Sequence, residues 1–88
     1  MNIEIIGLTA GLLTTGCFIP QSIKALRAEN TRSISLLMYG LFSLGVLLWL
    51  IYGIFLNNRP MIITNALTLP LSLVILGKKI HNIRKGID

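Results

Sequence analysis

An indole and an amide in otherwise apolar sequence, Trp49 and Asn65, are the side chains best suited to act on a solute. The amide both donates and accepts hydrogen bonds, and the face of a tryptophan packs against the C–H groups of a sugar. Asn65 also begins a polar stripe that continues at Thr68 and Ser72, on one face of a helix. The stripe has two interpretations: it binds a neutral, polyhydroxylated ligand, or it forms hydrogen bonds between packed helices.

A second feature is Pro20, which is followed by Gln21 inside an apolar segment. Proline has no N–H to donate and its ring clashes with the carbonyl four residues back, here Gly16, so a helix should bend at this point. In a membrane the freed carbonyl must face protein or a wet cavity, and the Gln21 amide is placed to satisfy it. Pro70 adds a second defect of this kind beside Asn65. The alternative is that these prolines only kink membrane helices, in which proline is common.

The sequence offers no pattern typical of an enzyme. It contains no nucleophile–base pair, no metal-ligand spacing and no glycine-rich phosphate loop, and its one histidine, His81, stands alone. We therefore expect no catalytic residues, no metal and no cofactor. The net charge of +5 comes from basic residues that flank apolar segments without interleaved aromatic residues, which argues against nucleic acid as a partner.

The elements that must position these residues follow from the distribution of charge. Of the 88 residues, 53% are hydrophobic and 12% are charged, too few charges for the surface of a soluble domain. Three windows of low charge remain, each close to the ~17–25 residues that span a bilayer. The sequence predicts an all-α membrane protein whose single domain, residues 1–88, holds three transmembrane helices at about residues 3–26, 34–56 and 61–79.

The basic residues also predict an orientation. Seven of them lie in two clusters, one from Lys24 to Arg32 at the connection between the first two helices and one from Lys78 to Lys85 at the end of the third, whereas the remaining connection holds only Arg59. Because basic residues concentrate on the cytoplasmic side, we expect a multi-pass protein of the cell (inner) membrane with its N-terminus outside and its C-terminus in the cytoplasm.

The depth of Trp49 and Asn65 in the membrane and the small number of helices indicate how the chain would bind a solute. Trp49 and Asn65 lie about seven and five residues from the outer ends of their helices, roughly 10 and 7–8 Å deep, and therefore at nearly one level. Gly7 and Gly11 permit close approach of a neighbouring helix. Three helices do not easily enclose a solute pathway, so we expect a parallel homodimer of six helices.

Four segments in order resemble a bacterial SemiSWEET, a member of the wider PQ-loop group: Phe18–Gln21, Thr31–Ser35, Trp49–Gly53 and Pro60–Asn65. The resemblance covers almost the whole chain. It implies a homodimeric sugar facilitator that works by alternating access and holds its substrate between the subunits near the middle of the membrane.

The resemblance also implies roles for individual residues. Trp49 and Asn65 match the residues that contact the sugar. Pro20, with Gln21, matches the hinge for closure on the cytoplasmic side, and Phe18 matches the aromatic residue of the inner gate.

For the outer gate the resemblance implies Tyr52 and Arg59. The acidic partner often found in the following turn is missing, because this turn reads Asn57-Asn58-Arg59-Pro60. We therefore expect Arg59 to bond to Tyr52, to Asn58 or to a carbonyl group of the partner subunit.

The energetics of transport follow from the acidic residues. Proton-coupled carriers generally keep a carboxylate or histidine inside the membrane, whereas here the predicted spans contain only Glu4, at the outer rim. The missing acid predicts downhill, uncoupled transport, and together with the resemblance this implies a uniporter of a mono- or disaccharide. Two alternatives remain: a PQ-loop carrier of another neutral or small organic solute, and a non-transporting small membrane subunit.

Overall fold

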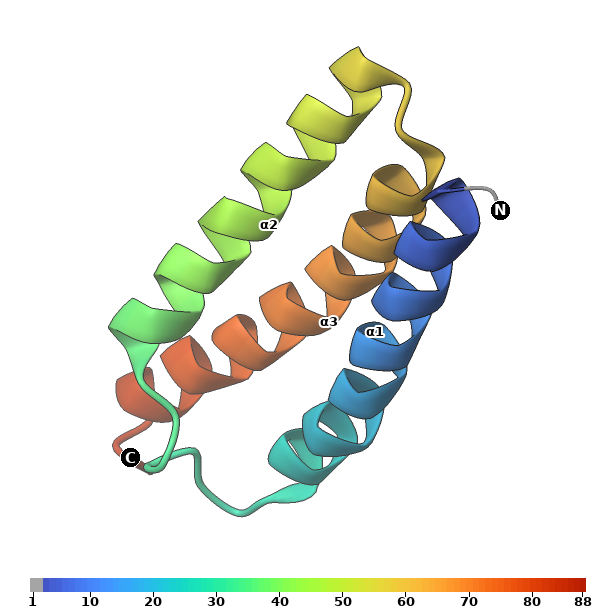
Figure 1. Ribbon diagram of the computed structural model, residues 1–88. Helices are drawn as coiled ribbons and strands as arrows, with labels where there is room; N and C mark the ends of the chain where they lie inside the picture. Colours follow the sequence, from blue (N-terminus) through green and yellow to red (C-terminus); the bar gives the residue numbers. More distant parts are fainter. Residues whose placement is uncertain (1–2) are drawn as a thin grey trace.

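The computed structural model describes residues 3–88 and consists of three helices. They are α1 (Ile3–Arg27), α2 (Leu36–Leu56) and α3 (Arg59–Arg84) (Figure 1). All three are long and apolar enough to cross a membrane. The Cα atoms extend over 51 × 23 × 14 Å, so the helices form an open layer about as long as a bilayer is thick.

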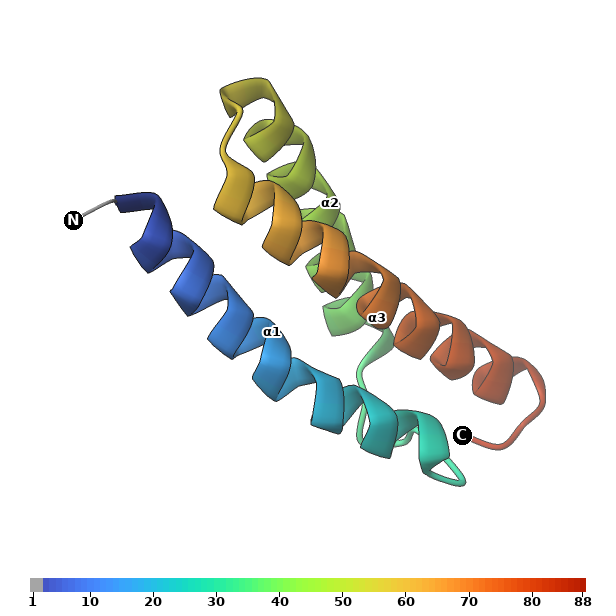
Figure 2. The same ribbon diagram turned by 90° about the vertical axis from the view of Figure 1, so that its right-hand side faces the viewer.

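Helix α3 lies between the other two. Both α1 and α2 pack along α3, and their backbones do not approach each other (Figures 1 and 2). The helices α1 and α3 run in the same direction and α2 runs in the opposite one. We call the end at which α1 and α3 begin the Arg59 end, and the end that holds the connection from 28 to 35 the loop end.

Close contacts of small residues hold α1 and α2 against the first turns of α3. A Cβ atom added to Gly7 would lie 3.4 Å from Pro60, and one added to Gly53 would lie 3.0 Å from Met61. At Gly11 an added Cβ would overlap the side chain of Thr64. The small residues at Gly7 and Gly11 therefore serve the close helix approach that their spacing predicts.

Side-chain caps fix where α2 and α3 begin. The Ser35 hydroxyl accepts a hydrogen bond of 3.1 Å from the backbone N–H of Met38, so α2 begins at Leu36 rather than at about 34. The Asn58 side chain accepts one of 3.1 Å from the N–H of Met61. Because proline fits the first turn of a helix, α3 begins at Arg59 rather than at about 61.

The end of α3 differs most from the prediction. The sequence predicts that the helix ends at about 79 and that the basic tail enters water, whereas the helix continues to Arg84. Lys78 and Lys79 both bond to the connection between α1 and α2, and Lys79 and Asn82 are buried. Charges that find partners within the protein do not need to leave the helix for water.

The burial pattern is inverted relative to a soluble bundle. Among the described residues only two hydrophobic side chains, Val46 and Ile75, are buried, whereas the buried polar group is larger and includes Thr15, Ser43 and Ser72. Large apolar side chains cover the outside of all three helices. This pattern is typical of helices that face lipid and hold one another through small and polar residues.

Candidate functional site

A cavity of about 410 Å³ lies toward the Arg59 end, and all three helices contribute to it. Its lining consists of Gly7, Trp49, Asn58, Pro60, Met61, Thr64 and Asn65. The structure therefore brings Trp49 of α2 and Asn65 of α3, which the sequence places at one depth, to the same cavity. None of the lining residues carries a charge.

The Asn65 side chain is held in place by its own helix. Its Nδ2 atom donates a hydrogen bond of 2.7 Å to the carbonyl oxygen of Met61, one turn earlier. An amide has two N–H groups and one carbonyl oxygen. One N–H and the oxygen are thus left to offer a ligand a donor and an acceptor together.

Trp49 is 55% exposed, like many of the large apolar side chains on the outside of the three helices. Its ring packs edge-to-face against Tyr52, with the ring centroids 5.8 Å apart. A second hollow of about 380 Å³, lined by Gly45, Leu48, Trp49 and Tyr52, adjoins it on α2. So large an exposed aromatic surface is suited to contact with a ligand or another chain.

The rest of the polar stripe on α3 has a different role. The hydroxyl oxygens of Thr68 and Thr15 lie 3.2 Å apart and share a hydrogen bond between α3 and α1. Ser72 accepts one of 3.1 Å from Ser43 and joins α3 to α2. The packing interpretation of the stripe therefore holds at Thr68 and Ser72, which bond to neighbouring helices, whereas Asn65 lines the cavity and stays the candidate for contact with a ligand.

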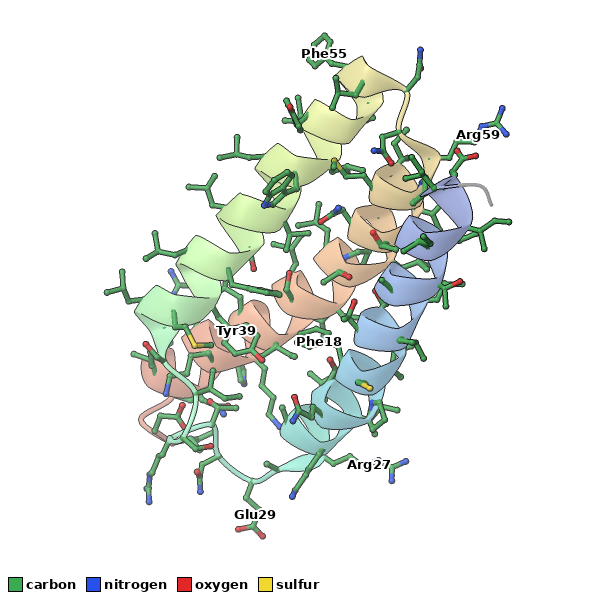
Figure 3. All side chains as sticks on the ribbon, in the orientation of Figure 1. Phe18, Arg27, Glu29, Tyr39, Phe55 and Arg59 are labelled. Carbon is green, nitrogen blue, oxygen red and sulfur yellow. The ribbon has the colours of Figure 1, made fainter. Side chains whose placement is uncertain are left out.

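Three aromatic rings cross from α1 to α2 nearer the loop end. Phe18 lies 5.8 Å from Phe42, and Phe42 lies 6.0 Å from Tyr39, measured between ring centroids. Figure 3 shows Phe18 and Tyr39 in the space between the two helices. Phe42 was not among the predicted site residues, although it lies seven residues before Trp49 on the same face of the helix.

These rings line a further cavity of about 300 Å³ together with hydroxyl groups. Its lining consists of Thr14, Thr15, Phe18, Phe42 and Thr68. Phe18 is thus placed at the wall of a space between α1 and α2, and its ring pair with Phe42 joins the two helices there.

The predicted hinge lies within a continuous helix, since α1 runs through Pro20 to Arg27. Gln21 is exposed, and its amide makes no hydrogen bond among residues 3–88. The neighbouring Ser22 is fully buried instead, and its hydroxyl donates a hydrogen bond of 2.8 Å to the carbonyl oxygen of Phe18. Such bonds from serine to the preceding turn often bend helices. The predicted contact of the Gln21 amide with the Gly16 carbonyl is thus not made among the described residues, and Ser22 bonds to a different carbonyl, that of Phe18.

The two residues of the predicted outer gate do not meet within one chain. Tyr52 packs on Trp49, whereas Arg59 is exposed and points away from the helices (Figure 3). Arg59 instead lines a hollow of about 190 Å³ with Glu4 and four apolar residues of α1 and α3. No hydrogen bond joins Arg59 to Tyr52 or Asn58 in the described part of the chain, and the Asn58 side chain caps α3.

Comparison with known proteins assigns the fold. The sequence profile of the family described as PQ loop repeat matches residues 3–62. The chain belongs to the PQ-loop family. It is 42% identical over 84 residues to the sugar transporter SemiSWEET of Escherichia coli, a match that covers 96% of this chain and 94% of that protein. It is also 42% identical over 77 residues to the SemiSWEET of Leptospira biflexa, covering 88% and 91% of the two chains.

A solved structure of SemiSWEET in the inward-open conformation is similar throughout. The TM-score is 0.88 at 42% sequence identity, and the match covers 94% of this chain and 96% of that one. This PQ-loop protein therefore has the three-helix SemiSWEET fold and is a multi-pass membrane protein. Its named relatives are transporters and not enzymes.

Proposed function

We propose that this PQ-loop protein is a sugar uniporter that moves a mono- or disaccharide down its concentration gradient. The observation that carries the proposal is the cavity shared by Trp49 and Asn65, whose lining is uncharged. An aromatic face beside a hydrogen-bonding amide matches the apolar and hydroxyl surfaces of a sugar, whereas a charged solute would require an opposite charge. The sugar-transporting relatives support the same substrate class.

The working unit in this proposal is a parallel homodimer. Because the backbones of α1 and α2 do not approach each other, the cavity of a single chain is open at the side. A second copy related by a twofold axis along the membrane normal would cover it and bring two Trp49 and two Asn65 side chains around one space. The exposed surface of Trp49 supports this arrangement.

Alternating access would use the two ends of the molecule in turn. The loop end, with most of the basic residues, faces the cytoplasm in this proposal. There Pro20 and Gln21 mark the hinge and the ring of Phe18 closes the inner gate against Phe42. At the opposite end, Tyr52 and Arg59 would form the outer gate only in the dimer, with Arg59 bonding to the partner subunit.

Radiolabelled glucose and sucrose uptake into proteoliposomes tests this function, with the wild type beside Asn65→Ala. We expect saturable uptake that the variant loses while crosslinking still detects the dimer. The matched control is Asn30→Ala, which removes an exposed amide of the loop whose oxygen accepts only a local hydrogen bond of 3.2 Å, from the N–H of Arg32. A well-folded wild-type dimer that takes up neither sugar would favour a carrier of another neutral solute, and full activity of the Asn65→Ala dimer would favour a non-transporting subunit.

A further inference from the structure

A cluster of polar side chains at the loop end has no part in the cavity or the gates. It joins the connection between α1 and α2 to the end of α3 and consists of Thr31, Lys78, Lys79, Asn82 and Asp88. We call it the inner clasp. Figures 1 and 2 show the segment after α3 turning back toward this connection.

Thr31 is the centre of the clasp, because each of its polar atoms has a partner from α3 or beyond. The backbone N–H donates to the Asp88 carboxylate at 2.8 Å, and the hydroxyl donates to the other carboxylate oxygen. The carbonyl oxygen accepts from Lys79 Nζ at 2.8 Å, and the hydroxyl also accepts from Asn82 at 3.1 Å. Thr31 is 1% exposed, so this loop residue is as buried as a core residue.

Two charges of the clasp, those of Lys79 and Asp88, neutralise each other. Lys79 Nζ lies 2.8 Å from the Asp88 carboxylate, and both side chains are nearly buried. Desolvation raises the pKa of Asp88, but the hydrogen bonds from Lys79 and Thr31 outweigh it and lower the pKa to about 2. The carboxylate is therefore charged throughout the physiological range.

Lys78 ties the end of α1 to α3. Its ammonium group donates to three carbonyl oxygens at that end, those of Ala25, Leu26 and Ala28, at 2.9, 2.6 and 2.6 Å. The last carbonyl groups of a helix lack partners within it and carry partial negative charge. One lysine of α3 thus supplies the C-terminal cap of α1.

Contacts of α1 with α3 lie on both sides of a proline in each helix. Toward the Arg59 end, Gly11 meets Thr64 and Thr15 bonds to Thr68, all before Pro20 and Pro70. The clasp contacts all come after these prolines. Each helix can bend at its proline because a backbone hydrogen bond is missing there.

We propose that the inner clasp makes the loop-end parts of α1 and α3 move as one body, hinged at Pro20 and Pro70. This inference rests on the proposed function. Helix α2 begins directly after the clasped loop, so a swing of this body carries Phe42 away from Phe18 and opens the inner gate. Lys78 and Asp88 are then positioning residues for transport, which act without touching the sugar.

Hydrogen exchange of the full chain tests the clasp independently of transport. The variant Asp88→Asn replaces a carboxylate oxygen by an amide N–H, which cannot accept the hydrogen bonds that Lys79 and Thr31 donate. The variant Lys78→Met removes the side chain that caps α1. We expect either variant to speed exchange by roughly tenfold in residues 21–35 and 78–88 together, because hydrogen bonds to charged groups stabilise by about that factor or more. Residues 5–16 should exchange as in the wild type.

The matched controls are Glu29→Gln and Lys85→Met, which remove exposed charges at the same end. Neither should change exchange in the two segments. A rise confined to the segment that carries the substitution would show that the two helices are not joined, and would overturn the clasp as a single body.

Transport then tests the positioning role. Trp49 is the one tryptophan of the chain, so its fluorescence reports sugar binding in the cavity. We expect Asp88→Asn and Lys78→Met to bind sugar within about twofold of the wild type but to transport it roughly fivefold more slowly or worse, because they impair motion and not contact. Unchanged flux would overturn the positioning role. If the wild type itself moves no sugar, the proposed function fails, and the exchange result alone decides whether the clasp joins the helices.

Discussion

The amide of Asn65 is oriented before any ligand arrives, since the carbonyl oxygen of Met61 holds one of its N–H groups. A ligand then meets a fixed donor and acceptor and does not have to order the side chain itself. The tryptophan on the opposite helix is steadied in a similar way by the ring of Tyr52. Both predicted contact residues are therefore supported by a neighbour within about one turn of their own helix.

At Asn65 we predict that the change Asn65→Ala weakens sugar binding by roughly tenfold, because it removes about one to two hydrogen bonds to a neutral ligand. Titration of the Trp49 fluorescence with sugar in detergent measures the effect. The Asn30→Ala variant serves as the control, and equal affinity of Asn65→Ala and the wild type would contradict the assignment of this residue.

Asp88 gives a pH-dependent prediction whose sign is fixed by its lowered pKa. The pKa falls from 3.8, the ordinary value for an aspartate carboxyl, to about 2 in the folded chain. Its contribution to stability is therefore complete above pH about 4 and is lost as the pH falls toward 2. Thermal unfolding of the wild type and Asp88→Asn should differ by the same amount at pH 5 to 8 and converge near pH 2; a difference that grows on acidification would contradict this.

At the scale of the helix, Pro20 and Pro70 have a different effect from the glycine contacts. Gly7, Gly11 and Gly53 hold α1 and α2 against α3 near the Arg59 end, where a rigid wall would serve the cavity. Pro20 and Pro70 lie farther along their helices than these contacts, toward the loop end, which moves in the proposed mechanism. Small residues therefore stiffen the bundle near the Arg59 end, and helix-breaking residues loosen it farther along.

The substitution Gly11→Ala should destabilise the fold by about 1–3 kcal/mol, because the new methyl group overlaps Thr64 and forces α1 away from α3. Gly16→Ala on the same helix is the matched control, since nothing lies within 4 Å of the added Cβ and alanine favours the helix. Thermal unfolding in detergent compares the two. Equal melting temperatures of the two variants would show that α1 can shift away from α3 without loss of stability.

A second prediction for α1 concerns the proposed hinge at Pro20. Pro20→Ala restores a backbone hydrogen bond and straightens the helix, so flux in proteoliposomes should fall several-fold or more, as expected when a conformational step is slowed. Sugar affinity, read from the Trp49 fluorescence, should stay at the wild-type value because Pro20 lies outside the cavity. Loss of affinity in parallel with flux would assign Pro20 to the binding site instead.

For the whole molecule, the distribution of acidic residues predicts transport without proton coupling. None of the residues that line the shared cavity titrates near neutral pH. Sugar uptake into weakly buffered proteoliposomes should therefore leave the internal pH unchanged, as measured with an entrapped pH-sensitive dye. Acidification that depends on both substrate and protein would contradict a uniport mechanism.

The helices and their order could be predicted from the sequence because hydropathy and charge act locally. Caps such as Ser35 and Asn58 are local as well. The extension of α3 could not be predicted, since Lys79 finds its partner at Thr31, far away in sequence. A charge pattern shows that a lysine needs a partner but not whether protein or water supplies it.

The candidate site shows the same division. Helical periodicity places Asn65, Thr68 and Ser72 on one face, but only the neighbouring helices decide that two of them bond to other helices and one lines the cavity. Periodicity likewise brings Tyr52 beside Trp49, whereas Tyr52 and Arg59 do not meet in the described part of the chain. The sequence alone therefore does not predict which side chains from different helices contact each other.

The central place of α3 has a consequence for biosynthesis. This helix is the last of the three to leave the ribosome, and the two that precede it have no backbone packing with each other. We expect α1 and α2 to wait in the bilayer as separate spans until α3 is inserted between them. Assembly of the protomer would then be a single late event. A protease or chaperone that recognises unassembled membrane helices would act mainly before α3 is inserted.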